Sequence, residues 1–139
     1  MPDLKTAIHI AVEAHHGQER KNGHPYILHP IRVMLAMRTE EEMMAAILHD
    51  VVEDTGVTLA DLKRARFPRG VLKAVDLLTK RPGQDYGAYL SALAKNPIAR
   101  AVKIGDLRDN LNIAELPTLH PKDLKRLARY HEALRQLAG

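Results

Sequence analysis

The chain has 139 residues, 45% hydrophobic and 27% charged, which fits one globular domain over residues 1–139 and excludes a disordered protein. Cysteine is absent, which excludes disulfides and thiolate metal ligands and agrees with a cytoplasmic setting. No apolar run approaches the roughly 18 residues of a membrane span. The net charge of +4 favours an anionic partner, without separating nucleic acid from a small phosphorylated ligand.

Helical periodicity dominates the chain, and no segment alternates as a strand would. The first helix should begin at Asp3 and stop at Gly17, which can supply a left-handed C-terminal turn. The loop GQERKNGHPYILHP then leads to Pro30, a favourable first residue for a helix over residues 31–37. Thr39 and Thr58 each stand three residues before an acid, which predicts two capping boxes that start the next helices.

Later helices are expected over residues 71–78, 86–94, 97–111 and 121–137. Seven to eight short helices with tight connections predict an all-α fold in one compact domain. The pattern leaves the oligomeric state open.

The segment AILHDVVED, residues 46–54, mixes aliphatic and ionisable side chains within one expected helix. At about 100° per residue, its ionisable residues share one arc, and its aliphatic residues share another. The ionisable residues are His49, Asp50, Glu53 and Asp54. Three acids within two turns, with no basic residue at i+4, repel one another. We interpret this arc as part of a metal site on a central helix, with a solvated helix face as the alternative.

Two residues elsewhere could complete such a site. His29 stands in YILHP, where the pre-proline backbone favours an extended conformation, and Asp106 stands in VKIGDLRDN on a late helix. Taken alone, such a His ordinarily packs or caps, and such an Asp ordinarily faces solvent. Together with His49 and Asp50 they form a ligand set that suits Mn²⁺ or Fe²⁺, with Zn²⁺ as an alternative.

The order H…HD…D resembles the motif of the HD superfamily of metal-dependent phosphohydrolases. AHHGQERKNGHPYILHP, AAILHDVVEDT and AVKIGDLRDNL, within residues 14–111, are similar to successive blocks of the RelA/SpoT-type hydrolase domain. The architecture resembles the stand-alone small alarmone hydrolases. This resemblance implies an all-α HD domain, a Mn²⁺ ion, and alarmone degradation in the stringent response. The implied reaction converts (p)ppGpp to GDP or GTP and pyrophosphate by removing the 3′-pyrophosphate.

The resemblance also implies individual roles. The implied metal ligands are His29, His49, Asp50 and Asp106. The implied catalytic acids, which would orient or activate water, are Glu53 and Asp54. The implied nucleotide contacts are Arg20, Lys21 and Asn110. Tyr26 would stack or pack, and Lys103 would either pair with Asp106 or lie at the surface.

Four residues depart from the pattern of the resembled family: Asn22, His24, Gly105 and Leu107. They bear on the walls of the base pocket, so the base specificity stays open, and Arg108 could replace the basic residue that is common at position 107. Alternative substrates are NADPH through its 2′-phosphate, a deoxynucleoside 5′-monophosphate, and (p)ppApp.

Two alternative functions do not involve catalysis. A catalytically silent nucleotide sensor would not need the complete ligand set. A nucleic-acid binder could use the basic stripe on the last helix, formed by Lys122, Lys125, Arg126 and Arg129. Scarce aromatic residues and the lack of a helix-turn-helix signature disfavour nucleic acid.

Overall fold

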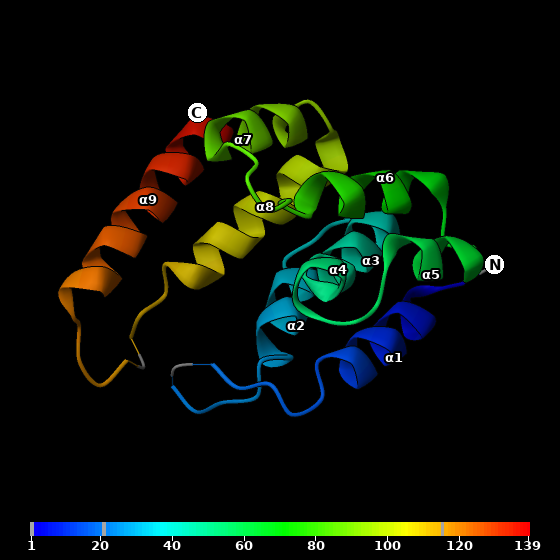
Figure 1. Ribbon diagram of the computed structural model, residues 1–139, viewed down its shortest axis with the longest axis horizontal. Coiled ribbons are helices and arrows are strands. Elements are labelled where there is room, and N and C mark those ends of the chain that lie inside the picture. The colour runs from blue at the N-terminus through cyan, green and yellow to red at the C-terminus, as the bar shows by residue number, and fades with distance from the viewer. Residues whose placement is uncertain (1, 21, 115) are drawn as a thin grey trace.

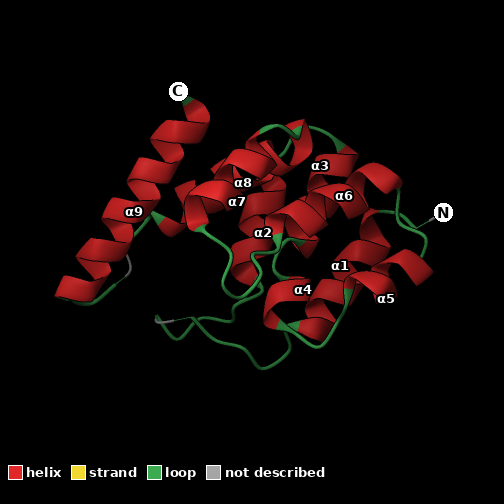
Figure 2. Cartoon of the chain, turned by 45° about the horizontal axis from the view of Figure 1, so that its top comes forward, coloured by secondary structure: helices red, strands yellow, loops and turns green. Residues whose placement is uncertain are grey.

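The computed structural model describes residues 2–20, 22–114 and 116–139, and across these stretches the chain forms helices and no strand (Figure 2). The helices are α1 (Leu4–Ala14), α2 (Leu28–Leu35), α3 (Glu40–Leu48), α4 (Val51–Asp54), α5 (Leu59–Arg64), α6 (Arg69–Leu78), α7 (Tyr86–Ala94), α8 (Pro97–Asn110) and α9 (Pro121–Ala138). This confirms the predicted all-α class. In the part of the chain that is described, no helix has the length and apolar character that a bilayer crossing requires.

Side-chain caps begin several of these helices as the sequence predicts. The Asp3 carboxylate accepts a hydrogen bond from the backbone N–H of Thr6, at 3.0 Å, and starts α1. Thr39 and Thr58 form the two predicted capping boxes at the starts of α3 and α5. Helix α1 ends at Ala14, and Gly17 follows with the predicted left-handed conformation, at φ +83°.

Helix α2 begins three residues earlier than expected, at Leu28. His29 is therefore helical, and the expectation of an extended pre-proline backbone was wrong. The N–H of His29 donates to the carbonyl oxygen of Tyr26, at 2.9 Å, which closes a turn ahead of the helix. Pro30 is tolerated because N–H groups in a first helical turn have no acceptor within the helix.

The segment expected to be one helix through residues 46–54 is broken into α3 and α4. The N–H of His49 bonds to the carbonyl oxygen of Ala46, three residues back, at 3.3 Å. Asp50 adopts φ −104° and ψ −2°, and the ladder resumes when the N–H of Asp54 donates to the carbonyl oxygen of Asp50, at 2.9 Å. The break raises the number of helices in the described stretches above the seven to eight expected.

Helix α3 lies at the centre of the helical packing, as its apolar composition predicts. Its residues 44–48 are all buried, and it packs against α1, α2, α6 and α8 (Figure 1). Helix α9 packs along α8 and α7 at one edge of the molecule (Figure 1). The arrangement leaves the start of α2, the α3–α4 break and the second half of α8 facing one another.

Candidate metal centre

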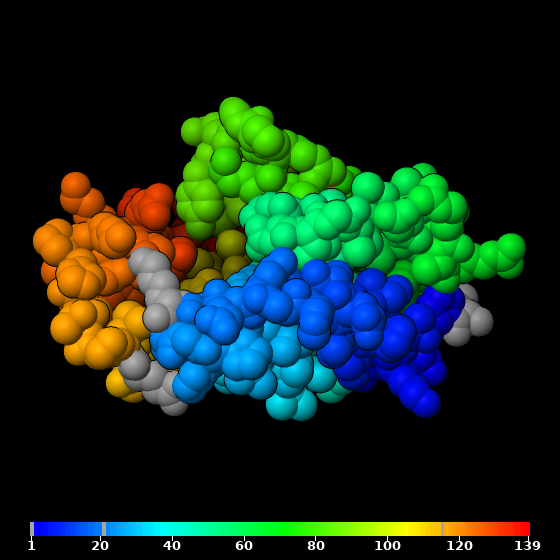
Figure 3. Space-filling view, turned by 60° about the horizontal axis from the view of Figure 1, so that its bottom comes forward, coloured from blue at the N-terminus to red at the C-terminus, as the bar shows by residue number. Residues whose placement is uncertain are grey.

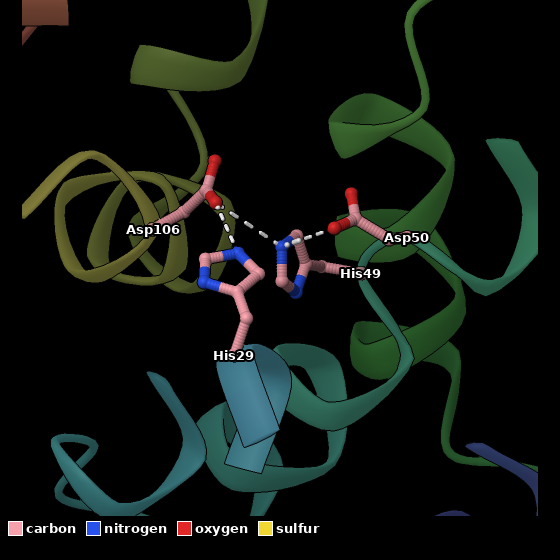
Figure 4. Close-up of side chains that lie close together, drawn as sticks. All are labelled: His29, His49, Asp50 and Asp106. Carbon is pink, nitrogen blue, oxygen red and sulfur yellow. Dashed lines mark hydrogen bonds and ion pairs between the residues drawn. The ribbon is translucent and has the colours of Figure 1, made fainter. Parts of the chain in front are cut away.

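Four side chains from three parts of the chain converge beneath this junction (Figure 4). Their ligand atoms all lie within 4.8 Å of one another, and the residues are His29, His49, Asp50 and Asp106. The Nε2 atom of His29 is 2.8 Å from Oδ1 of Asp106. The Nε2 atom of His49 is 3.0 Å from Oδ2 of Asp50 and 3.4 Å from Oδ1 of Asp106. The structure therefore brings together all four residues predicted to bind the metal.

The break after α3 explains how two adjacent residues reach one point. On a continuous helix, the side chains of His49 and Asp50 would diverge by about 100°. The altered backbone at Asp50 turns its carboxylate toward the imidazole of His49 (Figure 4). Both side chains can consequently contribute to the same site.

The second nitrogen of each imidazole fixes which atom faces the centre. Nδ1–H of His29 donates to Oδ2 of Asp109, at 2.6 Å, and Nδ1–H of His49 donates to the carbonyl oxygen of Ala46, also at 2.6 Å. In the neutral rings both Nε2 atoms therefore carry lone pairs, and these lone pairs face carboxylate oxygens. Among the described residues, the buried Nε2 of His49 has no hydrogen-bond partner. Lone pairs that face one another repel, and a positive charge between them, from a metal ion or from a proton on Nε2, removes this repulsion.

The electrostatics of the cluster favour positive charge at its centre. Burial lowers the pKa of both imidazoles, but the neighbouring carboxylates outweigh burial and raise the pKa of His29 and His49. Burial raises the pKa of Asp106, yet Lys103 and the two histidines hold it well below its ordinary value. Two nitrogens and two carboxylates without thiolate form a donor set that fits a divalent metal ion.

Asp109 is a further residue of the candidate site, and the sequence analysis missed it. Besides His29, its carboxylate accepts hydrogen bonds from Nη1 of Arg20 at 3.0 Å and from Nε of Arg32 at 2.7 Å. A carboxylate behind a metal-binding imidazole fixes the ring and makes it a better ligand. Asp109 follows Asp106 by three helical positions and so shares its face, which is the signal that could have identified it.

Three of the residues with a less direct expected role surround the centre. Nζ of Lys103 donates to Oδ2 of Asp106 at 3.0 Å, so this lysine is paired and not a surface residue. The hydroxyl of Tyr26 donates to Oδ2 of Asp50. Nδ2 of Asn110 donates to Oδ1 of Asp106 at 3.1 Å, and its Oδ1 accepts from Nη2 of Arg20 at 3.0 Å. Each therefore positions a residue of the cluster.

The two acids expected to act on water lie at the solvent side of the cluster. Glu53 and Asp54 are exposed, and their carboxylates gather with that of Asp50. Oε1 of Glu53 accepts a hydrogen bond from the backbone N–H of Lys80, at 2.7 Å. Partial burial, assisted by the charge of Asp50, raises the pKa of both Glu53 and Asp54. Both groups can accept a proton more readily than an ordinary carboxylate.

A cavity of about 460 Å³ adjoins the centre, and we call it the first cavity. It is lined by the α1–α2 loop, the end of α8 and helix α9, and the space-filling view shows a recess among these segments (Figure 3). Arg20, Tyr26 and Asn110 line it, as do Arg126 and Tyr130 from α9, which the sequence analysis did not assign to a pocket. Lys21, an expected nucleotide contact, lies outside the described residues.

The four departures from the resembled family fall in different places. Asn22 lines the first cavity, whereas Leu107 is fully buried in the core. Gly105 and Arg108 line a different cavity, so Arg108 does not replace a basic residue at the metal centre. His24 is exposed in the α1–α2 loop and lines neither cavity, so Asn22 is the one altered position of the four that lines the first cavity.

The helical fold and its His–His–Asp–Asp cluster define a class of all-α proteins with a divalent metal site. A model of the HD domain family matches residues 7–85, which is more than half of the chain. The chain belongs to the HD domain family. The match includes His29, His49 and Asp50, and Asp106 lies beyond it.

Several curated proteins are similar to the chain in sequence. It is 34% identical over 121 residues to the guanosine-3′,5′-bis(diphosphate) 3′-pyrophosphohydrolase of Aquifex aeolicus, and this alignment covers 78% of the chain and 17% of that protein. It is 30% identical over 141 residues to the bifunctional (p)ppGpp synthase/hydrolase SpoT of Escherichia coli, and this alignment covers 91% of the chain and 20% of that protein. The chain thus spans about a fifth of the length of these relatives.

A solved structure of a metazoan ortholog of SpoT that hydrolyses ppGpp has the same fold. The TM-score is 0.79 at 24% sequence identity, and the alignment covers 99% of this chain and 86% of that protein. The likeness extends over the whole helical arrangement described above.

Proposed function

We propose that the chain hydrolyses the 3′-pyrophosphate of (p)ppGpp, yielding GDP or GTP and pyrophosphate, and that it uses Mn²⁺. The observation that carries this proposal is the convergence of four metal-binding side chains beside two exposed acids and an arginine-lined cavity. The similarity to 3′-pyrophosphohydrolases supports the choice of substrate. Fe²⁺ and Zn²⁺ are the alternative metals, and the cytoplasmic setting and the single domain over residues 1–139 stay predictions.

The metal ion and the acidic residue Glu53 would have different roles in the reaction. When bound, the metal ion would polarise the reacting phosphate and lower the pKa of a coordinated water. Glu53 would accept the proton of the attacking water, and the backbone N–H of Lys80 would hold its carboxylate in position. The bond between the ribose 3′ oxygen and phosphorus would break, the 3′ oxygen would take up a proton, and pyrophosphate would leave with the oxygen of water.

The first cavity would hold the nucleotide beside the centre. Arg20, Arg32 and Arg126 line it, and guanidinium groups bind phosphate oxygens through paired hydrogen bonds. The ring of Tyr130 and the side chains of Ile113 and Leu116 supply apolar walls for a base. The cavity volume of about 460 Å³ lies within the usual range of small-molecule sites.

A product analysis tests this proposal. The purified chain is incubated with Mn²⁺ and ppGpp, and the products are separated and identified. Release of GDP together with pyrophosphate is expected, and Asp50→Ala and EDTA should abolish it. Release of orthophosphate, or no turnover at any metal concentration, would refute the proposed reaction.

A second candidate function keeps the centre and changes the nucleotide. Asn22 lines the first cavity at one of the altered positions, so the wall around the base differs from that of the resembled family. NADPH, a deoxynucleoside 5′-monophosphate and (p)ppApp therefore belong in the same assay. Faster turnover of one of these compounds than of ppGpp would favour this candidate.

The two non-catalytic alternatives have less support. Arg126, from the basic stripe of α9, is half-buried and lines the first cavity, so it does not belong to an open face along α9 that would follow a nucleic-acid backbone. Steep salt-dependent DNA binding that survives EDTA would favour the nucleic-acid reading. Nucleotide binding without turnover in Mn²⁺ would favour a sensor. The oligomeric state stays open, and a measurement of the molecular mass of the protein in solution would determine it.

A further inference from the structure

A second cavity, of about 650 Å³, is bounded by α2, by the turn that follows it and by α8. Arg32, Asp109 and Asn112 line both the first and the second cavity, and Nε of Arg32 lies 2.7 Å from Oδ1 of Asp109. None of the four candidate metal ligands lines either cavity. Tyr26 and Asn110, which line the first cavity, hydrogen-bond to the two aspartates among these ligands, whereas no described side chain of the second cavity does so. It is therefore a distinct space, with no role in the proposed reaction.

The second cavity carries an excess of positive charge. Four arginines line it: Arg32, Arg38, Arg100 and Arg108. Arg32 is neutralised by Asp109, whereas Nε of Arg100 donates to an uncharged group, the carbonyl oxygen of Leu137, at 2.8 Å. Within the described part of the chain, no hydrogen bond or ion pair engages the guanidinium groups of Arg38 and Arg108.

The acids of the second cavity offset this excess only in part. Asp109 is already shared among Arg20, Arg32 and His29. Oε1 of Glu42 accepts hydrogen bonds from the backbone N–H groups of Arg38, at 3.0 Å, and Thr39, at 3.3 Å. Three guanidinium charges therefore stand against one carboxylate whose oxygen is engaged in capping α3.

Apolar side chains line the second cavity between the arginines, at a place where α2 and α8 pack closely against each other. These side chains belong to Ala36, Met37, Ala101 and Ile104. A Cβ atom on Gly105 would lie 3.0 Å from Cε of Met37 and 3.2 Å from Cγ1 of Val33, so glycine lets α2 and α8 approach closely here. The second cavity is therefore an open recess that combines apolar side chains with charged groups, and it offers both kinds of contact to a small molecule.

We propose that the second cavity binds a small anion that carries a diphosphate group. The three guanidiniums of Arg38, Arg100 and Arg108, less the carboxylate of Glu42, leave a net excess of two positive charges, which suits the two or three negative charges of a diphosphate, and arginine binds phosphate oxygens bidentately. The apolar side chains accommodate the body of a nucleotide, so the diphosphate belongs either to a nucleotide or to free pyrophosphate. The proposal is independent of the proposed hydrolysis.

The test is a titration of the ¹⁵N-labelled, EDTA-treated chain with inorganic pyrophosphate, followed by backbone amide chemical shifts. Saturable shifts are expected at Arg38, Ala101, Gly105 and Arg108. The double variant Arg38→Ala/Arg108→Ala should weaken the affinity at least ~10-fold, because each charged hydrogen bond contributes roughly this much. Both side chains are exposed, so the variant should keep the parental spectrum elsewhere.

A matched control separates a built site from general attraction of anions. Arg69→Ala/Arg129→Ala removes the same charge from two exposed positions that line neither cavity, and it should leave the affinity within about twofold. An equal loss of affinity in both double variants would overturn the proposal. Shifts confined to the α1–α2 loop, such as those of Gly23 and Tyr26, would also overturn it.

Two further ligands identify the source of the diphosphate. Tighter binding of GDP than of pyrophosphate at the second cavity would support a nucleotide ligand, and equal affinities would support free pyrophosphate. Orthophosphate that binds as tightly as pyrophosphate would refute selection for a diphosphate. Because the protein is metal-free and no turnover is measured, this outcome does not depend on whether (p)ppGpp is hydrolysed.

Discussion

Nδ1 of His29 lies 2.6 Å from Oδ2 of Asp109, and this contact links the candidate metal centre to the wall of the first cavity. The same carboxylate holds the guanidinium groups of Arg20 and Arg32. Its position fixes the ring of His29 so that Nε2 faces the other ligands. A single carboxylate thus orients a metal ligand and two cations on the nucleotide side.

Asp109→Asn should weaken metal binding by roughly 10–100-fold, the usual effect of losing a carboxylate behind a metal-bound histidine. The amide oxygen can still accept the hydrogen bond from His29, but the negative charge that strengthens the imidazole as a ligand is lost. Isothermal titration of Mn²⁺ into EDTA-treated and dialysed protein measures the affinity.

Asp76→Asn is the matched control for this substitution. Asp76 is exposed and pairs with Arg81 at 2.6 Å, away from the centre, so its variant should bind Mn²⁺ as the parent does. Parental affinity in Asp109→Asn would show that the carboxylate does not support His29.

The stability of the metal-free protein should depend on Asp109 in a pH-dependent way. Burial raises the pKa of Asp109, but the bonds from His29 and Arg32 outweigh burial and leave the pKa well below its ordinary value. A lowered pKa in the folded state stabilises the fold above the ordinary value of about 3.9, and this contribution fades as the pH falls further. Urea unfolding should therefore show a gap between parent and Asp109→Asn at pH 7 that narrows toward pH 3. A gap that is constant with pH would contradict this linkage.

Most of the helices could be predicted from the sequence because the residues that start and end a helix lie within a few positions of its ends. Asp3, Thr39 and Thr58 cap the helices that they were expected to cap, and Gly17 takes the left-handed conformation. The break between α3 and α4 escaped prediction because nothing in AILHDVVED disfavours a continuous helix. It accompanies the inward turn of Asp50, whose carboxylate contacts the neighbouring His49 and, from a distant part of the sequence, Tyr26.

Some residues of the candidate site could be predicted from the sequence, and others could not. The four ligand residues were accessible from the sequence because their types and order follow a known family pattern. Asp109 had only its spacing of three positions from Asp106 as a signal, and Arg32 had none, since the pairing of this carboxylate with two arginines and a histidine from other segments forms only in the folded chain. The second cavity also escaped notice, because its arginines come from α2, the turn after it and α8, and meet only in the folded chain.

Substitutions in the two acidic groups should separate metal binding from turnover. Asp50→Ala should lose both, because it removes a ligand and the partner of His49. Glu53→Ala should bind Mn²⁺ within a few-fold of the parent and lose turnover by roughly 10²–10⁴-fold, the usual contribution of a general base. Metal titration and a pyrophosphate-release assay on the same preparations provide the two measurements. Full activity in either variant would contradict the assigned roles.

Lys103→Met should destabilise the metal-free protein and increase the stabilisation that a metal ion provides. The buried ammonium lies 3.0 Å from Oδ2 of Asp106, and methionine keeps the length of the side chain without its charge. Removing one partner of a fully buried ion pair costs roughly 3–5 kcal/mol, and the contacts that Asp106 keeps with His29 and Asn110 should hold the loss below this range. A bound divalent ion would restore compensation to Asp106, so Mn²⁺ should raise the free energy of unfolding more in the variant than in the parent. Urea unfolding with and without Mn²⁺, with the exposed Lys95→Met as control, measures both effects, and equal metal increments in all three proteins would refute the role of Lys103.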